Sequence, residues 1–275
     1  AVLFHVFSRF PEAQYDLAPG ASRPPRTLLR SWRAEQLRQM DDYMHLARRM
    51  MASGGFPEPA VEIRIQKRMK GVARDILNEA RKGYEFVIMR RRGMAALTGM
   101  IIGSVTLKVL QGLTFAPLLI AGRKPPGKRL LIGFDGSVGA LHALKFAAGL
   151  VGPHPDFEFC LLHVLRDGSG GRPDLRRTFI PEEQLPSVRA NIMGRIEAAR
   201  SHLAALGIAP ERITTRFVSG AVSRAAEIAK CAEAENHGII VLGRRGVSRV
   251  RDFFVGRVTN KVLHLARDRS VWIVH

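Results

Sequence analysis

A loop near the C-terminal end of the chain has the residue types and spacing of a phosphate-binding site. Gly243 and Gly246 let the backbone turn sharply and approach a ligand closely. Gly256 then opens an expected helix over 258–266, whose free N–H groups and dipole favour a phosphate. The arginines in and beside the loop are Arg244, Arg245, Arg249, Arg251 and Arg257. Guanidinium groups at a helix N-terminus suit a polyphosphate, although the same glycines also fit a plain strand-to-helix connection.

Alternating strands and helices must position this loop. Buried strands are expected at 129–134, 161–164 and 270–274. A helix over 140–150 follows the first of them, and strands that alternate with helices form a parallel sheet with helices on both faces. Ligands of such folds bind at the carboxyl ends of the strands, so the chemistry is expected in three loops. These loops follow Phe134, Val164 and Leu242.

The chain repeats itself at a constant offset of 153 residues. The segment 87–110 aligns without a gap on 240–263, and each copy has a glycine, nine residues and a second glycine. The match continues to the closing strands, 118–121 against 271–274. The chain is therefore predicted to be two copies of one α/β domain.

The first copy lacks a segment that the second copy has. Residues 3–6 parallel 161–164, but only the second of these strands is preceded by another strand and helix, over 129–150. Since the chain also has no initiator methionine, a truncation at the N-terminus is expected. The predicted domains are 1–122, without its first strand and helix, and 129–275, joined by the linker 123–128.

Charge, cysteine content and hydropathy narrow the function classes. The 43 Lys and Arg against 24 Asp and Glu give a net charge of +19, which favours a polyanion as partner. The excess positive charge is spread over 1–122 (+9) and 123–275 (+10), so it does not form a charged tail.

Cys160 and Cys231 form neither a disulfide framework nor a CxxC metal motif, and a cytoplasmic location is expected. A proline and several glycines interrupt the weakly charged stretch 94–122, which disfavours a membrane span.

The loop and the strands together resemble the universal stress protein family. Its ATP-binding signature is GxxG, nine residues, then glycine followed by Ser or Thr, and 243–257 is similar to it. The segments that look like the family's first strand and loop, second strand and last strand are 130–137, 162–164 and 270–274. The resemblance covers nearly the whole chain, strongly in 127–275 and more loosely in 1–122.

The resemblance implies two tandem, doubly wound parallel-sheet domains of the Rossmann-like or flavodoxin-like class. Family members commonly dimerise through their last strands, so 118–121 is expected to pair with 271–274 as a pseudo-dimer within the chain. Family analogy further implies an adenine-nucleotide site, with Asp135 at the nucleoside, the Val164 backbone at adenine and the loop at ribose and phosphates. The implied nucleotide-binding residues are Asp135, Val164, Gly243, Gly246, Gly256, Arg257 and Thr259.

Both copies depart from the family signature. In the second, Arg257 replaces the hydroxyl residue after Gly256, where an arginine either pairs with phosphate or fills its space. In the first, Arg90 replaces the first glycine and the aspartate loop is absent, so that site is expected to be inactive. The residues of this degenerate site are Gly93, Gly103, Ser104 and Thr106.

The remaining polar candidates have plainer interpretations. His5 and His163 occupy matching strand ends and are expected to pack or hydrogen-bond rather than catalyse. Glu182 and Glu183 fall at a loop-to-helix boundary, where a solvated role is favoured. Asp135 has an alternative role as the cap of the helix that follows it.

Two function classes remain. The first is a regulatory stress-response protein that binds ATP or another adenine nucleotide, with Mg²⁺ only if ATP is bound. The sequence offers no visible general base and no second carboxylate for a metal, so at most weak ATP hydrolysis is expected. The second is a basic protein- or nucleic-acid-interaction module with a decayed nucleotide pocket, which the lack of interleaved aromatic residues disfavours. The expected partners are thus an adenine nucleotide and a protein, without a membrane.

Overall fold

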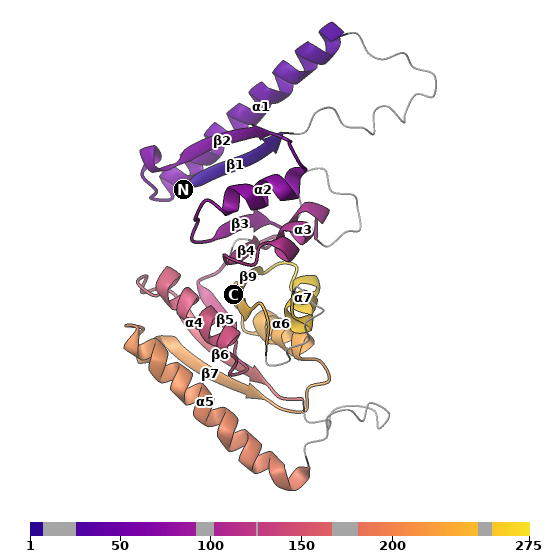
Figure 1. The fold of residues 1–275 in the computed structure, drawn as a ribbon. Helices are drawn as coiled ribbons and strands as arrows, with labels where there is room; N and C mark the ends of the chain where they lie inside the picture. The colour runs from indigo at the N-terminus through magenta and orange to yellow at the C-terminus, as the bar shows by residue number, and fades with distance from the viewer. Residues whose placement is uncertain (8–25, 92–101, 125, 167–180, 247–254) are drawn as a thin grey trace. The chain divides into compact units, whose positions relative to one another are not determined.

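The chain forms two compact units, 1–79 and 80–275 (Figure 1). The computed structural model describes residues 1–7, 26–91, 102–124, 126–166, 181–246 and 255–275, without the side chains of 26–33 and 182. In the first unit β1 (Val2–Phe7) and β2 (Glu62–Lys67) form a two-stranded parallel sheet, against which α1 (Arg26–Ser53) packs. A short 3₁₀ helix, η2 (Glu58–Ala60), precedes β2, and α2 (Val72–Ala80) follows it.

The second unit is built on a seven-stranded sheet of order β3-β4-β9-β8-β5-β6-β7. Its strands are β3 (Val87–Arg90), β4 (Leu118–Ala121), β5 (Arg129–Gly133), β6 (Glu158–Val164), β7 (Ile213–Val218), β8 (Ile239–Gly243) and β9 (Ser270–Val274). All neighbouring strands are parallel except β4 and β9. The continuous apolar runs of β5 and β8 are buried, as expected of strands covered on both faces.

Helices cover both faces of this sheet. They are α3 (Ser104–Gly112), α4 (Val138–Val151), α5 (Leu185–Ala205), α6 (Arg224–Ala234) and α7 (Arg257–Leu265), with short 3₁₀ helices η4 (Glu182–Gln184) and η5 (Pro210–Arg212). Within the second half, α4 and α5 lie on one face, and α6 and α7 lie on the other (Figure 1). Serine side chains start two helices, because Ser137 Oγ accepts from Ala140 N at 3.1 Å and Ser223 Oγ from Ala226 N at 3.4 Å. The predicted doubly wound α/β fold is confirmed.

The closing strands of the two sequence copies pair with each other. In the antiparallel pair of β4 and β9, Leu118 lies opposite Ile273 and Ile120 lies opposite Val271. This is the strand pair that was expected to join the copies as a pseudo-dimer.

Two buried arginines at equivalent positions of the repeat reinforce this pairing. The guanidinium of Arg244 donates to three carbonyl oxygens at the C-terminal end of α3, those of Leu110, Gln111 and Leu113, at 2.8, 3.0 and 2.8 Å. The guanidinium of Arg91 donates to the carbonyl oxygens of Leu263 and Ala266 at the C-terminal end of α7, and to that of Arg269 directly before β9. Each arginine therefore follows a strand of one copy and caps a helix of the other.

The strand order explains why the unit boundary falls at residue 79. In the second half β5 joins β6 to β8, and by the repeat β1 corresponds to β6 and β3 to β8. The described part of the first half contains no counterpart of β5 that could join them. Consequently β1 and β2 form their own sheet, whereas β3 and β4 extend the sheet of the second half. The domains 1–122 and 129–275 remain a prediction from the repeat.

The described part of the weakly charged stretch 94–122 contains two separate elements. Residues 94–101 lie outside the described part, and the remainder contains α3 and β4. Among the described helices, none is both long and apolar enough to cross a membrane.

Candidate functional site

A cavity of about 450 Å³ lies at the carboxyl ends of β5, β6 and β8. The strand order reverses between β5 and β8, and a doubly wound sheet opens a crevice at such a point. All seven residues that were predicted to bind nucleotide in the second copy lie on its wall: Asp135, Val164, Gly243, Gly246, Gly256, Arg257 and Thr259. The fold thus brings together residues that are far apart in the sequence.

The cavity wall combines apolar and cationic side chains. The apolar ones belong to Phe134, Leu162, Val164, Ile228, Leu242 and Val258. The cationic ones belong to Arg224, Arg245 and Arg257. Asp135 is the one carboxylate and His163 the one imidazole among the described lining residues. This composition suits a ligand that joins an apolar ring to an anionic group.

Gly243 and Gly246 are each required by close packing. A Cβ on Gly243 would lie 2.6 Å from the carbonyl carbon of Gly139 in α4. A Cβ on Gly246 would lie 2.5 Å from Oδ2 of Asp135. Side chains at these positions would separate the loop from α4 or displace the Asp135 carboxylate.

Asp135 shapes the loop after β5 instead of capping the next helix. Its Oδ1 accepts a hydrogen bond from Ser137 N at 3.0 Å, and Ser137 itself is the N-cap of α4. The alternative role of Asp135 as the helix cap is therefore wrong, because Ser137, two residues later, takes that position. The half-buried carboxylate remains on the cavity wall beside Gly246.

The start of α7 is tied to the end of β8. Gly256 is the N-cap of α7 and its N–H donates to the Arg244 carbonyl oxygen at 2.8 Å, while Thr259 Oγ1 donates to the Gly243 carbonyl oxygen at 3.0 Å. Thr259 is buried, so its hydroxyl holds the helix against the strand. Arg257, the first residue of α7, is exposed on the cavity wall.

The first copy repeats this geometry at the equivalent positions. Gly103 is the N-cap of α3, which begins at Ser104, and the Gly103 N–H donates to the Arg91 carbonyl oxygen at 2.8 Å. Thr106 Oγ1 donates to the Arg90 carbonyl oxygen at 3.0 Å. Gly93 lies outside the described residues, as do Arg249 and Arg251 of the second copy. The degenerate site thus retains the helix-to-strand ties of the second copy.

Two lining side chains, His163 of β6 and Arg224 of α6, bind backbone carbonyl oxygens beside the cavity. His163 Nδ1 donates to the Phe134 carbonyl oxygen at 2.8 Å and the ring stacks on Phe217 at 5.9 Å, in agreement with the expected packing role. Burial lowers the pKa of His163, which keeps the imidazole neutral. Arg224 Nε donates to the Val164 carbonyl oxygen at 3.2 Å, so this backbone oxygen already has a partner.

Sequence reasoning missed Arg224 and misassigned Arg244. Arg224 is the first residue of α6, and a cation at a helix N-terminus is unfavourable without an anion nearby, the same signal that singled out Arg257. Arg244 was grouped with the arginines around the phosphate loop, but its buried guanidinium caps α3. Residue type and spacing gave its charge correctly but could not give the direction of its side chain.

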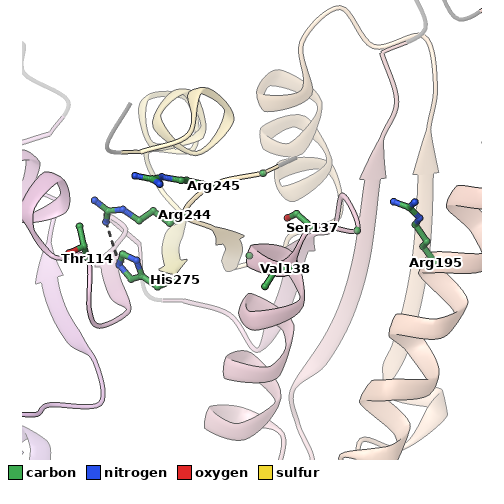
Figure 2. A pocket seen from close by; sticks show the side chains of 10 residues that line it. Thr114, Ser137, Val138, Arg195, Arg244, Arg245 and His275 are labelled. Carbon is green, nitrogen blue, oxygen red and sulfur yellow. Dashed lines mark hydrogen bonds between the residues drawn. The ribbon is translucent and has the colours of Figure 1, made fainter. Parts of the chain in front are cut away.

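A second cavity of about 540 Å³ adjoins the first and shares Ser137, Arg245 and Gly246 with it. Figure 2 shows Arg244 and Arg245 on one side of it and Arg195 of α5 on the other, with Ser137 between them. A Cβ on Gly136 would lie 3.1 Å from the Arg195 side chain, so α5 packs closely over this loop. The loop at 243–246 therefore shares this cavity with the side chain of Arg195.

Comparison with known proteins gives consistent matches. A model of the universal stress protein family matches residues 127–275. Universal stress protein YxiE of Bacillus subtilis (strain 168) is 27% identical over 143 residues, which cover 50% of this chain and 93% of that protein.

Solved structures resemble the chain over most of its length. A universal stress protein from Archaeoglobus fulgidus DSM 4304 has a TM-score of 0.58 and 19% identity, and the match covers 93% of this chain and 84% of that one. The functionally unknown protein PA1789 from Pseudomonas aeruginosa PAO1 has a TM-score of 0.53 and 15% identity, covering 98% and 92%. These likenesses show a shared fold.

Proposed function

We propose a nucleotide-dependent regulatory role for this chain, which belongs to the universal stress protein family and so to a family of stress-response proteins. Its cavity at β5, β6 and β8 binds an adenine nucleotide, with ATP as the first candidate. The observation that carries the proposal is that Asp135, the glycine loop and the start of α7 all line one cavity with three arginines.

The wall offers a place for each part of the ligand. Apolar side chains such as Leu162 and Ile228 receive the adenine ring, while Arg245 and Arg257 pair with phosphates. The dipole at the start of α7 adds to this attraction for anions.

The same wall favours binding over hydrolysis. His163 is neutral and its Nδ1 is engaged by the Phe134 carbonyl oxygen, so it is poorly placed as a base for water. Asp135 offers the only lining carboxylate among the described residues, which leaves a Mg²⁺ ion dependent on the nucleotide's own phosphates. Occupancy, and not turnover, is therefore the regulatory signal.

Two glycine variants test the proposal. Gly246→Ala places a Cβ 2.5 Å from Asp135 Oδ2, so we expect calorimetric ATP affinity to fall at least about tenfold, or about 1.4 kcal/mol. Gly149→Ala in α4 is the matched control, because a Cβ there meets nothing within 4 Å. Equal ATP affinities of the two variants would show that the loop is not part of the binding site. If neither variant nor the unaltered chain binds ATP, the result instead favours the alternative of a basic protein- or nucleic-acid-interaction module.

A further inference from the structure

A second group of chemically reactive side chains lies away from the nucleotide cavity. Cys160 Sγ, a carboxylate oxygen of Glu235 and a ring nitrogen of His237 all lie within 4.8 Å of one another. Cys160 lies near the amino end of β6, and His237 lies two residues before β8. The group therefore lies at the amino ends of the strands, whereas the cavity lies at their carboxyl ends.

The C-terminal turn of α6 places two of the three residues. Glu235 is the C-cap, and Asn236 follows with a left-handed φ of 53°. The N–H of His237 donates to the Ala232 carbonyl oxygen at 2.8 Å, which completes a Schellman motif. This turn folds His237 back beside Glu235 and toward Cys160 of the sheet.

Burial makes the group unusual. Cys160 is 4% exposed and His237 is 1% exposed. Within the described part of the chain, His237 Nδ1 is buried and has no hydrogen-bond partner. Polar atoms in protein interiors are nearly always paired, so a buried imidazole with an unpaired Nδ1, beside a thiol and a carboxylate, points to a missing ligand.

The two carboxylate oxygens of Glu235 face different neighbours. Glu235 uses Oε1 in an ion pair with Arg216, whereas Oε2 faces His237 Nε2 at 3.9 Å. Neutral imidazole and a carboxylate oxygen are both metal ligands.

We propose that Cys160, Glu235 and His237 bind a transition metal ion of borderline softness, Zn²⁺ in the first instance. Thiolate, imidazole and carboxylate are the three ligand types of protein zinc sites, and a water molecule fills the fourth tetrahedral position. Zinc–ligand bonds of about 2.0–2.3 Å require the three ligand atoms to move only about 1 Å closer to one another. Binding releases one proton from the Cys160 thiol to solvent as the metal–sulfur bond forms.

Cobalt(II) is the probe that tests the site. The full chain, reduced and freed of metal by a chelator, is titrated with Co²⁺ and followed by the near-ultraviolet thiolate-to-cobalt absorption, and then with Zn²⁺ to displace the cobalt. We expect one Co²⁺ per chain with this absorption, its replacement by Zn²⁺, and loss of the absorption in Cys160→Ser. Cys231→Ser is the matched control, since Cys231 is also a buried thiol but is not one of the three ligands.

His237→Gln extends the test to a second ligand. We expect the affinity for Co²⁺ to fall at least about tenfold in this variant. If circular dichroism shows that Cys160→Ser does not fold, the His237→Gln result decides whether the metal site exists. A spectrum without thiolate absorption, or absorption that persists in Cys160→Ser, would overturn the proposal. ATP binding is measured separately, so the failure of one site is distinguishable from the failure of the other.

Discussion

Arg257 is the first residue of α7 and is exposed on the wall of the cavity at the carboxyl ends of β5, β6 and β8. The N-terminal end of a helix carries partial positive charge, so a cation there is unfavourable unless an anion compensates it. In the proposed function, a phosphate of the nucleotide is one such anion. Arg257 is accordingly the residue whose replacement tells whether this departure from the family signature serves binding or blocks it.

Arg257→Ser is expected to weaken ATP binding by roughly 1–3 kcal/mol, about 5- to 150-fold, as for loss of a hydrogen bond to a charged group. Calorimetry measures the affinity. Lys261→Ser removes the same charge one turn later on α7, from an exposed residue that does not line the cavity, and should change the affinity little. Tighter binding by the Arg257 variant would mean that the arginine occupies the phosphate position.

At the scale of elements, the capping arginines connect the loop of one copy to a helix of the other. Burial lowers the pKa of both Arg91 and Arg244 to about 10, so both remain charged near neutral pH. Each holds three carbonyl oxygens with one planar guanidinium. A lysine in either place keeps the charge but lacks the geometry to hold all three.

We therefore expect Arg244→Lys to lower the free energy of unfolding by about 1.5–3 kcal/mol, the range for hydrogen bonds to a charged group. Urea unfolding followed by circular dichroism measures it. The neighbouring Arg245→Lys is the matched control, because Arg245 is exposed and should give a change near zero. Equal stabilities of the two variants would show that the buried contacts of Arg244 do not support the paired copies.

Elements with strong local signals were predicted well from the sequence. The expected strands 129–134 and 118–121 correspond to β5 and β4, and the helix expected over 140–150 lies within α4. Interactions between distant segments were not visible. Arg224 at the start of α6 donates to Val164 at the end of β6, and Cys160 lies near His237 because α6 packs against β6. Such contacts depend on side-chain direction and tertiary packing, which residue spacing does not encode.

For the whole molecule, the net charge of +19 complicates any binding experiment. Polyanions of many kinds will associate with such a surface at low ionic strength, and salt screens these contacts strongly. A nucleotide whose adenine ring also packs on the apolar part of the cavity wall depends less on salt than a purely electrostatic contact. Ionic strength therefore separates a nucleotide site from general attraction to anions.

The most direct measurement is the identity and amount of nucleotide released on denaturation of chain purified in high salt. Chromatography against adenine standards separates a mononucleotide from any nucleic acid fragment. The proposed function predicts an adenine mononucleotide in an amount approaching one per chain, and its loss in Gly246→Ala. Chain that releases no nucleotide, fails to bind added ATP and is retained on DNA at low salt would contradict the nucleotide site and favour a basic interaction module.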